Sequence, residues 1–500
     1  MSTTSSIFFG ELFDAATGSY KSYINGKWLL SASSKLVTNF NPSTRKEQYK
    51  VQACTREEID SAYEGCSEAQ AKWRSVPLWK RAEALHGVAK ILREQKETIA
   101  ECLVNEIAKT RKDSLSEVER SADLIEYCAE EGVRLLSKGD LFTSDAFKGN
   151  DRNKLCMSSR IPLGTVLCIP PFNYPVNLAV SKIAPALIAG NAVLMKPPTQ
   201  GSVAGLHLAQ CFHQSGLFPP GLVNVLTVKA SENGNYLAEH PGCHCLSFTG
   251  GDVGLSLAKR VGMIPVQMEL GGKDACVVCN DADLDLAAKH IIKGGFSYSG
   301  QRCTAVKIIF AQEEIADALI EKVLAGVNKL TVGMPDDNCN ITPVISESSA
   351  NFIEGLVLDA KEKGAKFLME YKREGNLIWP LLLDHVRPDM DIAWKEPFGP
   401  VVPVVRVSSI DQAVEHANKN RLALQSCVFT KDIQKAIQIS DSMQAGTVQI
   451  NGAPARGPDH FPFQGFRDSG IGSQGIVNSI GLMSKTKTTV INLTSPSYTV

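Results

Sequence analysis

Short apolar runs alternate with helix-length segments through most of the chain after Gly164. This alternation is typical of a parallel β-sheet whose strands are joined by helices. The strands expected in a first set are Thr165–Ile169, Ala192–Met195, Val223–Leu226 and Cys245–Phe248. A second set comprises Ala275–Val278, Lys307–Ala311, Val401–Val405, Cys427–Phe429 and Thr447–Ile450, with Glu313–Leu330 as a helical spacer. The pattern predicts an α/β protein with two such layers joined near Gly271–Gly272.

Two further segments have clear periodicity. The apolar side chains of Arg81–Lys109 recur with the helical period on one face, which predicts one long amphipathic helix. Ser484–Val500 is rich in β-branched residues and is expected to form a strand that pairs outside its own domain. Because 500 residues exceed what one hydrophobic core usually serves, we expect two or more domains.

Composition excludes several classes of protein. The chain is 44% hydrophobic and 21% charged, which is typical of a globular protein and not of a disordered one. Its formal net charge of −1 gives no reason to expect a nucleic acid or an anionic membrane as a partner. The longest mostly apolar stretch, Val176–Met195, contains Asn177, Lys182 and Pro185 and is therefore not expected to span a membrane.

Fourteen cysteines in a chain of this length do not indicate a disulfide framework, which belongs to short secreted proteins. The start of the chain lacks the pattern of a signal or transit peptide, since Glu11 and Asp14 come early. We therefore expect a cytoplasmic protein with reduced thiols.

Cys303 is the strongest candidate for a nucleophile. It follows the polar, glycine-containing segment that begins at Gly294, and it is preceded by Arg302, a permanent cation that favours a thiolate. Other cysteines, such as Cys168 and Cys427, lie in apolar runs where a thiol behaves as a small hydrophobe. Any single cysteine of fourteen is more often structural than catalytic, but the surroundings of Cys303 favour catalysis.

Glu269 and Asn173 are candidates for supporting roles. Glu269 follows an apolar strand and precedes two glycines, where a carboxylate could activate water; a solvated turn residue is the alternative. Asn173 lies in the segment Pro170-Pro-Phe-Asn-Tyr-Pro after the strand ending at Ile169. Its amide could donate to a developing oxyanion, or it could cap a helix.

Two glycine motifs need to be distinguished. Gly470-Ile-Gly-Ser-Gln-Gly475 matches the dinucleotide fingerprint literally, but no strand precedes it and no βαβ unit follows, so we expect a turn into a helix. Phe248-Thr-Gly-Gly-Asp-Val-Gly254 follows an expected strand and opens a helix, whose free N–H groups could face a pyrophosphate.

Two clusters resemble metal sites without completing one. Cys276-Val-Val-Cys279 lies in a strand-like apolar run and has no second cysteine pair. The cluster of His240, Cys243, His244 and Cys245 overlaps the start of a core strand. We therefore expect no metal centre.

Taken together, these pieces resemble the aldehyde dehydrogenase superfamily. Six motifs occur in the order and at the spacing of that family: Phe-Asn-Tyr-Pro, Lys196-Pro-Pro-Thr, Phe-Thr-Gly-Gly, Glu-Leu-Gly-Gly-Lys, Gly-Gln-Arg-Cys-Thr and Glu396-Pro-Phe-Gly-Pro. The resemblance covers nearly the whole chain. Within the superfamily, the segments around Cys303, Lys196 and Arg456 are similar to those of the NADP-dependent, non-phosphorylating dehydrogenases of glyceraldehyde 3-phosphate in plants and algae.

The resemblance implies a Rossmann-like cofactor domain (residues 1–146 and 168–272), an α/β catalytic domain (residues 273–470) and a small β-flap (residues 147–167 and 484–500) used in assembly, commonly of a homotetramer. It implies that Cys303 is the nucleophile and that Glu269 activates the hydrolytic water. The Asn173 amide and the Cys303 N–H would then form the oxyanion hole.

The resemblance also assigns the cofactor site. Lys196 and Glu396 would bind the ribose hydroxyls, and Phe398 would lie near the nicotinamide. Relatives that prefer NAD usually have a carboxylate where this chain has Thr199, so Thr199 and Lys196 favour the 2′-phosphate of NADP. The loop that begins with Gly250 and Gly251 is one residue shorter than is common in the superfamily and lacks its serine.

By the same similarity, Arg120, Tyr174, Arg302 and Arg456 would converge on the phosphate of glyceraldehyde 3-phosphate, because guanidinium groups suit phosphate oxygens. Three alternatives stay open: a semialdehyde dehydrogenase in which the arginines bind a carboxylate, a catalytically silent structural or binding protein, and a metal- or redox-sensing role for the cysteine clusters.

Overall fold

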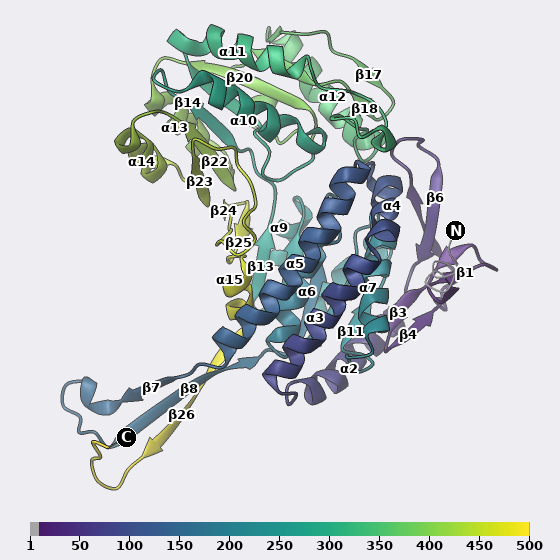
Figure 1. The fold of residues 1–500 in the computed structure, drawn as a ribbon, viewed down its shortest axis with the longest axis vertical. Coiled ribbons are helices and arrows are strands. Elements are labelled where there is room, and N and C mark those ends of the chain that lie inside the picture. The colour runs from purple at the N-terminus through teal and green to yellow at the C-terminus, as the bar shows by residue number, and fades with distance from the viewer. Residues whose placement is uncertain (1–9, 500) are drawn as a thin grey trace.

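The computed structural model describes residues 10–499 and contains two large, mainly parallel sheets covered by helices (Figure 1). The predicted α/β architecture is therefore confirmed. The first sheet has the strand order β25-β13-β12-β9-β10-β11-β3-β4. Its strands are β3 (Ser22–Ile24), β4 (Lys27–Leu29), β9 (Thr165–Ile169), β10 (Ala192–Met195), β11 (Val223–Val225), β12 (Cys245–Thr249), β13 (Val266–Glu269) and β25 (Gly470–Ile471).

The strand order of the first sheet creates a crevice at its centre. β9 pairs in parallel with β10 on one side and with β12 on the other, and β12 pairs in parallel with β13. The chain therefore adds β10 and β11 on one side of β9 and then adds β12 and β13 on its other side. In open parallel sheets, ligands bind beside the carboxyl ends of the strands at such a reversal. The predicted site residues Asn173, Gly250 and Glu269 follow or end three of these strands.

Helices cover the faces of this sheet. The helix α6 packs against α5, and α5 packs against α3 and α4 (Figure 1). The helices of this part are α2 (Arg56–Trp73), α3 (Leu78–Glu94), α4 (Lys96–Ile107), α5 (Arg111–Leu136), α6 (Asn177–Ile188), α7 (Ser202–Ser215), α8 (Ala230–Glu239), α9 (Val253–Ala258) and α15 (Ile476–Leu482).

The prediction of one helix over Arg81–Lys109 is wrong, because the structure divides this segment between α3 and α4. The backbone of Gln95 leaves helical values at φ −97° and ψ 9° and separates the two helices. Buried leucines and isoleucines, such as Leu92 and Ile99, continue the same spacing across the break. The apolar periodicity therefore does not reveal the interruption, and no glycine or proline marks it.

The second sheet has the order β16-β19-β20-β15-β14-β22-β23, and all its strands except β16 run parallel. These strands are β14 (Ala275–Val278), β15 (Ile308–Gln312), β16 (Lys366–Phe367), β19 (Leu381–Asp384), β20 (Val401–Val407), β22 (Gln425–Phe429) and β23 (Thr447–Ile450). Its helices are α10 (Leu284–Phe296), α11 (Glu313–Val327), α12 (Glu347–Glu362), α13 (Ile410–Lys419) and α14 (Ile433–Ser442).

The alternation of side chains along β14 explains why it reads as a continuous apolar run. Ala275 and Val277 belong to one buried cluster, whereas Cys276 and Val278 belong to another. Successive side chains of a strand point to opposite faces, and both faces of this sheet are covered by helices. Cys276 and Cys279 consequently lie in different clusters, and their C-x-x-C spacing does not bring them together.

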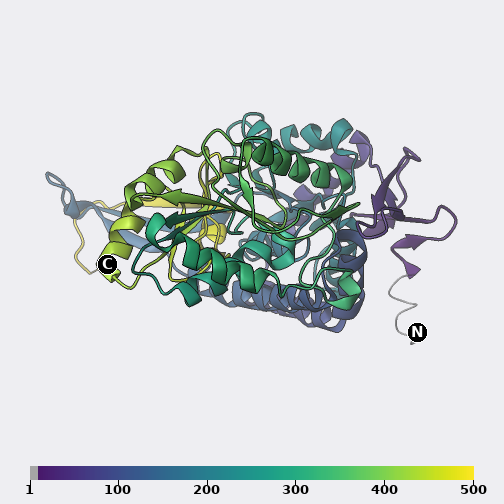
Figure 2. The same cartoon turned by 90° about the horizontal axis from the view of Figure 1, so that it is seen from above.

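Three antiparallel strands form a flap that projects from one end of the molecule (Figures 1 and 2). They are β7 (Asp140–Thr143), β8 (Lys154–Pro162) and β26 (Ser484–Asn492), with β8 in the middle. The strand predicted for Ser484–Val500 is therefore present as β26 and pairs with a distant segment, although Val500 lies outside the described residues.

The N-terminal strands β1 (Phe13–Asp14), β2 (Ser19–Tyr20), β5 (Leu36–Phe40) and β6 (Glu47–Gln52) form a separate small sheet. Short pairs β17 (Arg373–Glu374) with β18 (Leu377–Ile378) and β21 (Leu422–Ala423) with β24 (Phe466–Arg467) complete the strands. No helix among residues 10–499 is long and apolar enough to cross a membrane.

Candidate active site

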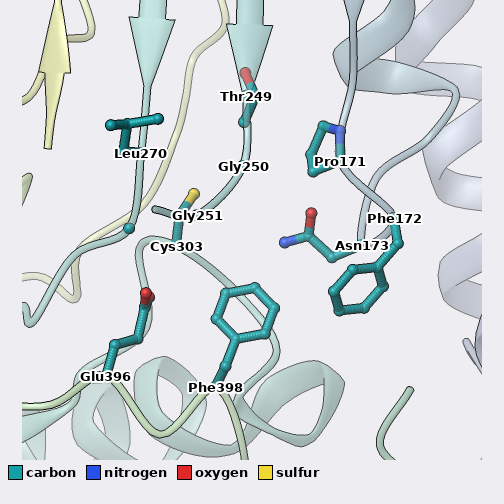
Figure 3. Close-up of a pocket in the computed structure, with 11 residues that line it drawn as sticks. Pro171, Phe172, Asn173, Thr249, Gly250, Gly251, Leu270, Cys303, Glu396 and Phe398 are labelled. Carbon is teal, nitrogen blue, oxygen red and sulfur yellow. The ribbon is translucent and has the colours of Figure 1, made fainter. Parts of the chain in front are cut away.

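A cavity of about 300 Å³ lies where the two sheets face each other (Figure 3). The loops after β9, β12 and β13 approach it from the first sheet, and the loops that precede β15 and β20 approach it from the second. The residues that line it are Pro171, Phe172, Asn173, Thr249, Gly250, Gly251, Leu270, Gly271, Cys303, Glu396 and Phe398. Six of the predicted site residues are in this set.

Cys303 and Glu269 are in direct contact. The residue Cys303 is partly exposed, and its Sγ donates to Glu269 Oε1 at 2.9 Å. Burial, the negative charge of Glu269 and this hydrogen bond raise the pKa of Cys303 well above its ordinary value, whereas Lys307 and Arg456 lower it less. In this arrangement Cys303 is a protonated thiol, and Glu269 is placed to accept its proton.

This finding corrects the expectation that Arg302 stabilises a thiolate at Cys303. The Arg302 Nη2 donates to the carbonyl oxygen of Gly294 at 2.7 Å, and within residues 10–499 its buried Nε has no hydrogen-bond partner. The cations that favour the thiolate are Lys307 and Arg456. Adjacency in sequence did not indicate which cation faces the sulfur.

Asn173 lies opposite Cys303 in the cavity (Figure 3). Its Nδ2 donates to the carbonyl oxygen of Gln301 at 2.9 Å, which ties the turn after β9 to the loop that carries Cys303. An amide nitrogen carries two hydrogens, so one donor remains for an oxygen in the cavity. The geometry therefore allows Asn173 to act as an oxyanion donor as well as a tether.

Glu269 has further partners that the sequence did not reveal. Its Oε2 accepts from Arg456 Nη1 at 2.8 Å and lies 3.5 Å from the hydroxyl of Thr249. Thr249 in turn accepts from the buried Lys182 Nζ at 2.7 Å. Burial lowers the pKa of Lys182 to about 8. The signal in the sequence was Lys182 itself, the one charged residue in the mainly apolar helix α6.

A second buried lysine supports the turn that carries Asn173. Lys109 is ion-paired with Glu117, and its Nζ donates to the carbonyl oxygen of Asn173 at 2.6 Å. The same ammonium lies 3.7 Å from the ring centre of Tyr174, a cation–π distance. Glu117 also accepts from the backbone N–H of Val176, so this ion pair fixes the start of α6.

The predicted cofactor residues lie at the carboxyl edge of the first sheet. Lys196 and Thr199 directly follow β10, and Thr199 is exposed. Burial lowers the pKa of Lys196 to about 8, and among the described residues its ammonium has no hydrogen-bond or ion-pair partner. An unpaired, partly buried cation beside an exposed hydroxyl fits a phosphate group.

The part of the cavity lined by Gly251, Gly271 and Glu396 also has room for a ligand. Gly250 and Gly251 follow β12, and a Cβ atom at Gly251 would meet nothing within 4 Å. Glu396 accepts from Lys307 at 2.8 Å and from the Gly272 N–H at 3.3 Å. A Cβ atom at Gly271 would lie 2.1 Å from Glu396 Oε2, so only glycine leaves room for this carboxylate. These residues fit a dinucleotide.

The literal fingerprint Gly470–Gly475 does not belong to this site. Gly470 and Ile471 form the edge strand β25, and Gly475 precedes the first residue of α15. The expected turn into a helix is present, but the expectation that no strand precedes it is wrong, because β24 comes just before the motif and the motif itself begins as β25.

The predicted phosphate-binding residues come together only in part. Arg120 Nη2 donates to the carbonyl oxygen of Arg456 at 2.7 Å. Burial lowers the pKa of Arg120, but the hydrogen bonds to Asp459 and, more weakly, the nearby Tyr174 raise it above its ordinary value. Within residues 10–499, no hydrogen bond or ion pair joins Arg302 to the other three. Arg120 and Arg456 each have a carboxylate partner, Asp459 and Glu269 respectively.

The histidines and cysteines of the second metal-like cluster have structural contacts. The ring of His240 stacks on Tyr63 with centroids 4.2 Å apart, and His244 Nδ1 accepts from the backbone N–H of Thr165 at 3.1 Å. The Cys243 thiol donates to the carbonyl oxygen of Cys245 at 3.6 Å.

Comparison with known proteins agrees with this geometry. The aldehyde dehydrogenase family profile matches residues 28–489. The NADP-dependent glyceraldehyde-3-phosphate dehydrogenase of Pisum sativum is 66% identical over 481 residues, which are 96% of this chain and 97% of the relative. The enzyme of that name from Bacillus halodurans, solved in complex with NADP, superposes with a TM-score of 0.93 at 44% identity, covering 95% of this chain and 99% of the other.

A more distant relative bears on the substrate. Aldehyde dehydrogenase 21 of Physcomitrella patens, solved with the reaction product succinate, is 30% identical and superposes with a TM-score of 0.90, covering 95% of this chain and 98% of the other. The family profile and these relatives span nearly the whole chain. This chain belongs to the aldehyde dehydrogenase family.

Proposed function

We propose that this chain oxidises glyceraldehyde 3-phosphate to 3-phosphoglycerate with NADP+ and water, through a thiohemiacetal and then a thioester on Cys303. The observation that carries the proposal is the 2.9 Å contact between Cys303 Sγ and Glu269 Oε1 in a cavity that Asn173 also lines. The names of the relatives at 63–66% identity support the substrate and the cofactor.

The residues divide the chemistry between them. Glu269 accepts the Cys303 proton, the thiolate attacks the aldehyde carbon, and Asn173 with the Cys303 N–H donates to the resulting oxyanion. NADP+, when bound, supplies the hydride acceptor. Glu269 passes its first proton to solvent and then removes a proton from water, which attacks the thioester. The acid is released, and the departing Cys303 thiolate takes this proton from Glu269 and becomes the free thiol again. Inorganic phosphate takes no part in this sequence.

The residues that we propose to hold NADP are Lys196, Thr199, Gly250, Gly251, Glu396 and Phe398. The unpaired Lys196 ammonium and the Thr199 hydroxyl favour the 2′-phosphate, and Glu396 is placed for ribose hydroxyls. The residues that we propose to bind the substrate phosphate are Arg120, Tyr174, Arg302 and Arg456.

An activity panel tests the proposal. Purified protein is assayed with glyceraldehyde 3-phosphate, unphosphorylated glyceraldehyde and succinate semialdehyde, each with NADP+ and NAD+, with and without inorganic phosphate. We expect the highest kcat/KM with glyceraldehyde 3-phosphate and NADP+, independent of phosphate. The second candidate function is that of a semialdehyde dehydrogenase. It is supported by the relative solved with succinate and by the arginines, which would bind a carboxylate as well as a phosphate. A higher kcat/KM with succinate semialdehyde than with glyceraldehyde 3-phosphate would favour this candidate.

We further propose a division into a cofactor domain (residues 1–146 and 168–272), a catalytic domain (residues 273–470) and an assembly flap (residues 147–167 and 484–500). The flap exposes large apolar side chains, among them Phe147, Met157 and Val490, and exposed apolar patches favour association. This supports a homotetramer, and light scattering should show a smaller assembly for Val490→Lys.

We also propose that the protein acts in the cytoplasm, within glycolysis. All fourteen cysteines are free thiols, which suits a reducing compartment. Microscopy of a fluorescent fusion tests the location.

A further inference from the structure

The guanidinium group of Arg120 is already occupied by a carboxylate. Arg120 Nε donates to Asp459 Oδ2 at 2.6 Å, and Nη2 donates to Asp459 Oδ1 at 2.7 Å. This is the two-pronged geometry that a guanidinium also offers to a phosphate. The Asp459 side chain is 15% exposed and the Arg120 side chain 39%, so water reaches the pair mainly from the arginine side.

Asp459 lies on the loop that also carries Arg456, and Arg120 ties this loop to α5. Besides pairing with Asp459, Arg120 Nη2 donates to the carbonyl oxygen of Arg456 at 2.7 Å. The ring of His460 lies against Tyr127 of α5 with centroids 5.3 Å apart. The loop residues 456–460 therefore dock on the helix that presents Arg120.

The charges around the proposed phosphate position are nearly balanced. Arg120 is paired with Asp459, and Arg456 is paired with Glu269. A substrate phosphate that binds the Nε and Nη2 edge of Arg120 must displace the Asp459 carboxylate. One that binds elsewhere on Arg120 is repelled by it, because like charges a few ångströms apart disfavour each other. In either position, Asp459 weakens the binding of a phosphate group to Arg120.

We propose that Asp459 is a positioning and specificity-determining residue, whose carboxylate competes with the substrate phosphate for Arg120. The inference rests on the proposed function, in which Arg120 binds that phosphate. Asp459 keeps the arginine oriented when no substrate is present, and it limits the affinity of the site for phosphate ions and for the phosphorylated product. It acts through Arg120 and does not touch the reacting carbon.

The test compares wild type with Asp459→Asn, which keeps the size of the side chain and removes its charge. A neutral acceptor binds a guanidinium about half as strongly as a carboxylate, so we expect the KM for glyceraldehyde 3-phosphate to fall roughly fivefold. Competitive inhibition by inorganic phosphate should strengthen by a similar factor. The kcat/KM for unphosphorylated glyceraldehyde should not change, and Asp459→Glu should restore wild-type behaviour.

Two controls separate this role from a structural one. Glu126→Gln removes one carboxylate of another two-pronged arginine pair on α5, with Arg93, and should leave all these constants unchanged. In an Arg120→Leu background, Asp459→Asn should have no further effect on KM, because the residue acts through Arg120. Circular dichroism of each variant monitors folding.

The opposite result would overturn the inference. If Asp459 only anchors the loop, Asp459→Asn raises the KM for glyceraldehyde 3-phosphate, weakens inhibition by phosphate and lowers the kcat/KM for glyceraldehyde to the same extent. If Asp459→Asn changes neither the KM for glyceraldehyde 3-phosphate nor the inhibition by phosphate, Asp459 does not compete for Arg120. If wild type shows no preference for glyceraldehyde 3-phosphate, the proposed substrate is wrong. Calorimetric titration of inorganic phosphate into the NADP-loaded variants then decides the role of Asp459 by itself.

Discussion

Glu269 binds Cys303 with one carboxylate oxygen and Arg456 with the other, at 2.9 Å and 2.8 Å. The proposed nucleophile, the proposed water-activating base and a cation proposed for the substrate phosphate thus form one connected unit. Any group that draws Arg456 away from Glu269 makes this carboxylate a stronger base, since an opposite charge favours the ionised form.

The first prediction concerns the reactivity of Cys303 toward iodoacetamide. Because burial and Glu269 raise its pKa well above the ordinary value, alkylation should be slow at neutral pH and accelerate as the pH rises into the alkaline range. Glu269→Gln removes the negative charge, so the thiol pKa should fall and alkylation at pH 7.5 should become several-fold faster.

For this test, the measured alkylation must come from Cys303 alone and not from other accessible thiols. Cys156 and Cys339 are the other partly exposed cysteines and are replaced by serine in both proteins. Slower alkylation of Glu269→Gln would mean instead that Glu269 activates the thiol even without substrate.

A second prediction concerns cofactor choice. Thr199→Glu introduces a negative charge where we place the 2′-phosphate of NADP, beside the unpaired Lys196. The kcat/KM with NADP+ should fall at least roughly tenfold, corresponding to about 1.4 kcal/mol, while the value with NAD+ falls less or rises. Thr199→Gln is the uncharged control. An equal loss with both cofactors would contradict this placement of the phosphate.

A third prediction tests the contact between Gly271 and Glu396. A methyl group at position 271 would lie 2.1 Å from Glu396 Oε2 and must push this carboxylate away from Lys307 and Gly272. Gly271→Ala should therefore raise the Kd for NADP, measured by fluorescence titration, without changing alkylation of Cys303. Gly355→Ala on α12, where a methyl group meets nothing within 4 Å, should leave NADP binding unchanged.

A fourth prediction uses the buried Lys182. Its pKa of about 8 in the folded protein lies below the value of about 10.4 in the unfolded chain, so the unfolded state binds more protons between these values. Stability should therefore rise from pH 8 to pH 10, by about 2 kcal/mol for this group. Lys182→Met should reduce the rise in chemical denaturation by about this amount, while the similarly buried Lys196 keeps its own contribution. The variant should also slow turnover, because Thr249 loses its donor. A variant that keeps the wild-type pH dependence would refute the assignment.

Among the strands that the sequence predicted, β9, β10, β14 and β23 begin and end at the expected residues. Strands covered on both faces, such as β10 and β14, are short and apolar, which sets them apart from their surroundings. The strands β3, β4, β16, β19 and β25, which lie at or next to an edge of their sheet, were not predicted. The break at Gln95 between α3 and α4 escaped detection, since an apolar stripe with helical spacing continues through it.

Within the site, Cys303, Glu269 and Asn173 could be identified because each lies beside glycines or prolines that shape a turn. The contacts among charged groups could not. Arg302 is adjacent to Cys303 in sequence but donates to Gly294, whereas Arg456, far along the chain, binds Glu269. Asp459 was missed for the same reason, because its pairing with Arg120 depends on how a distant loop docks on α5.

Mass spectrometry of Glu269→Ala, mixed with NADP+ and glyceraldehyde 3-phosphate and quenched in acid, shows whether Cys303 carries the acyl group. We expect one NADPH per active site, because loss of the Glu269 charge lowers the pKa of the thiol and Cys303 can then lose its proton to solvent. We also expect a phosphoglyceroyl thioester on the peptide that contains Cys303, which persists because no carboxylate activates water. Absence of the adduct despite NADPH formation, or an adduct on a different cysteine, would contradict this role of Cys303.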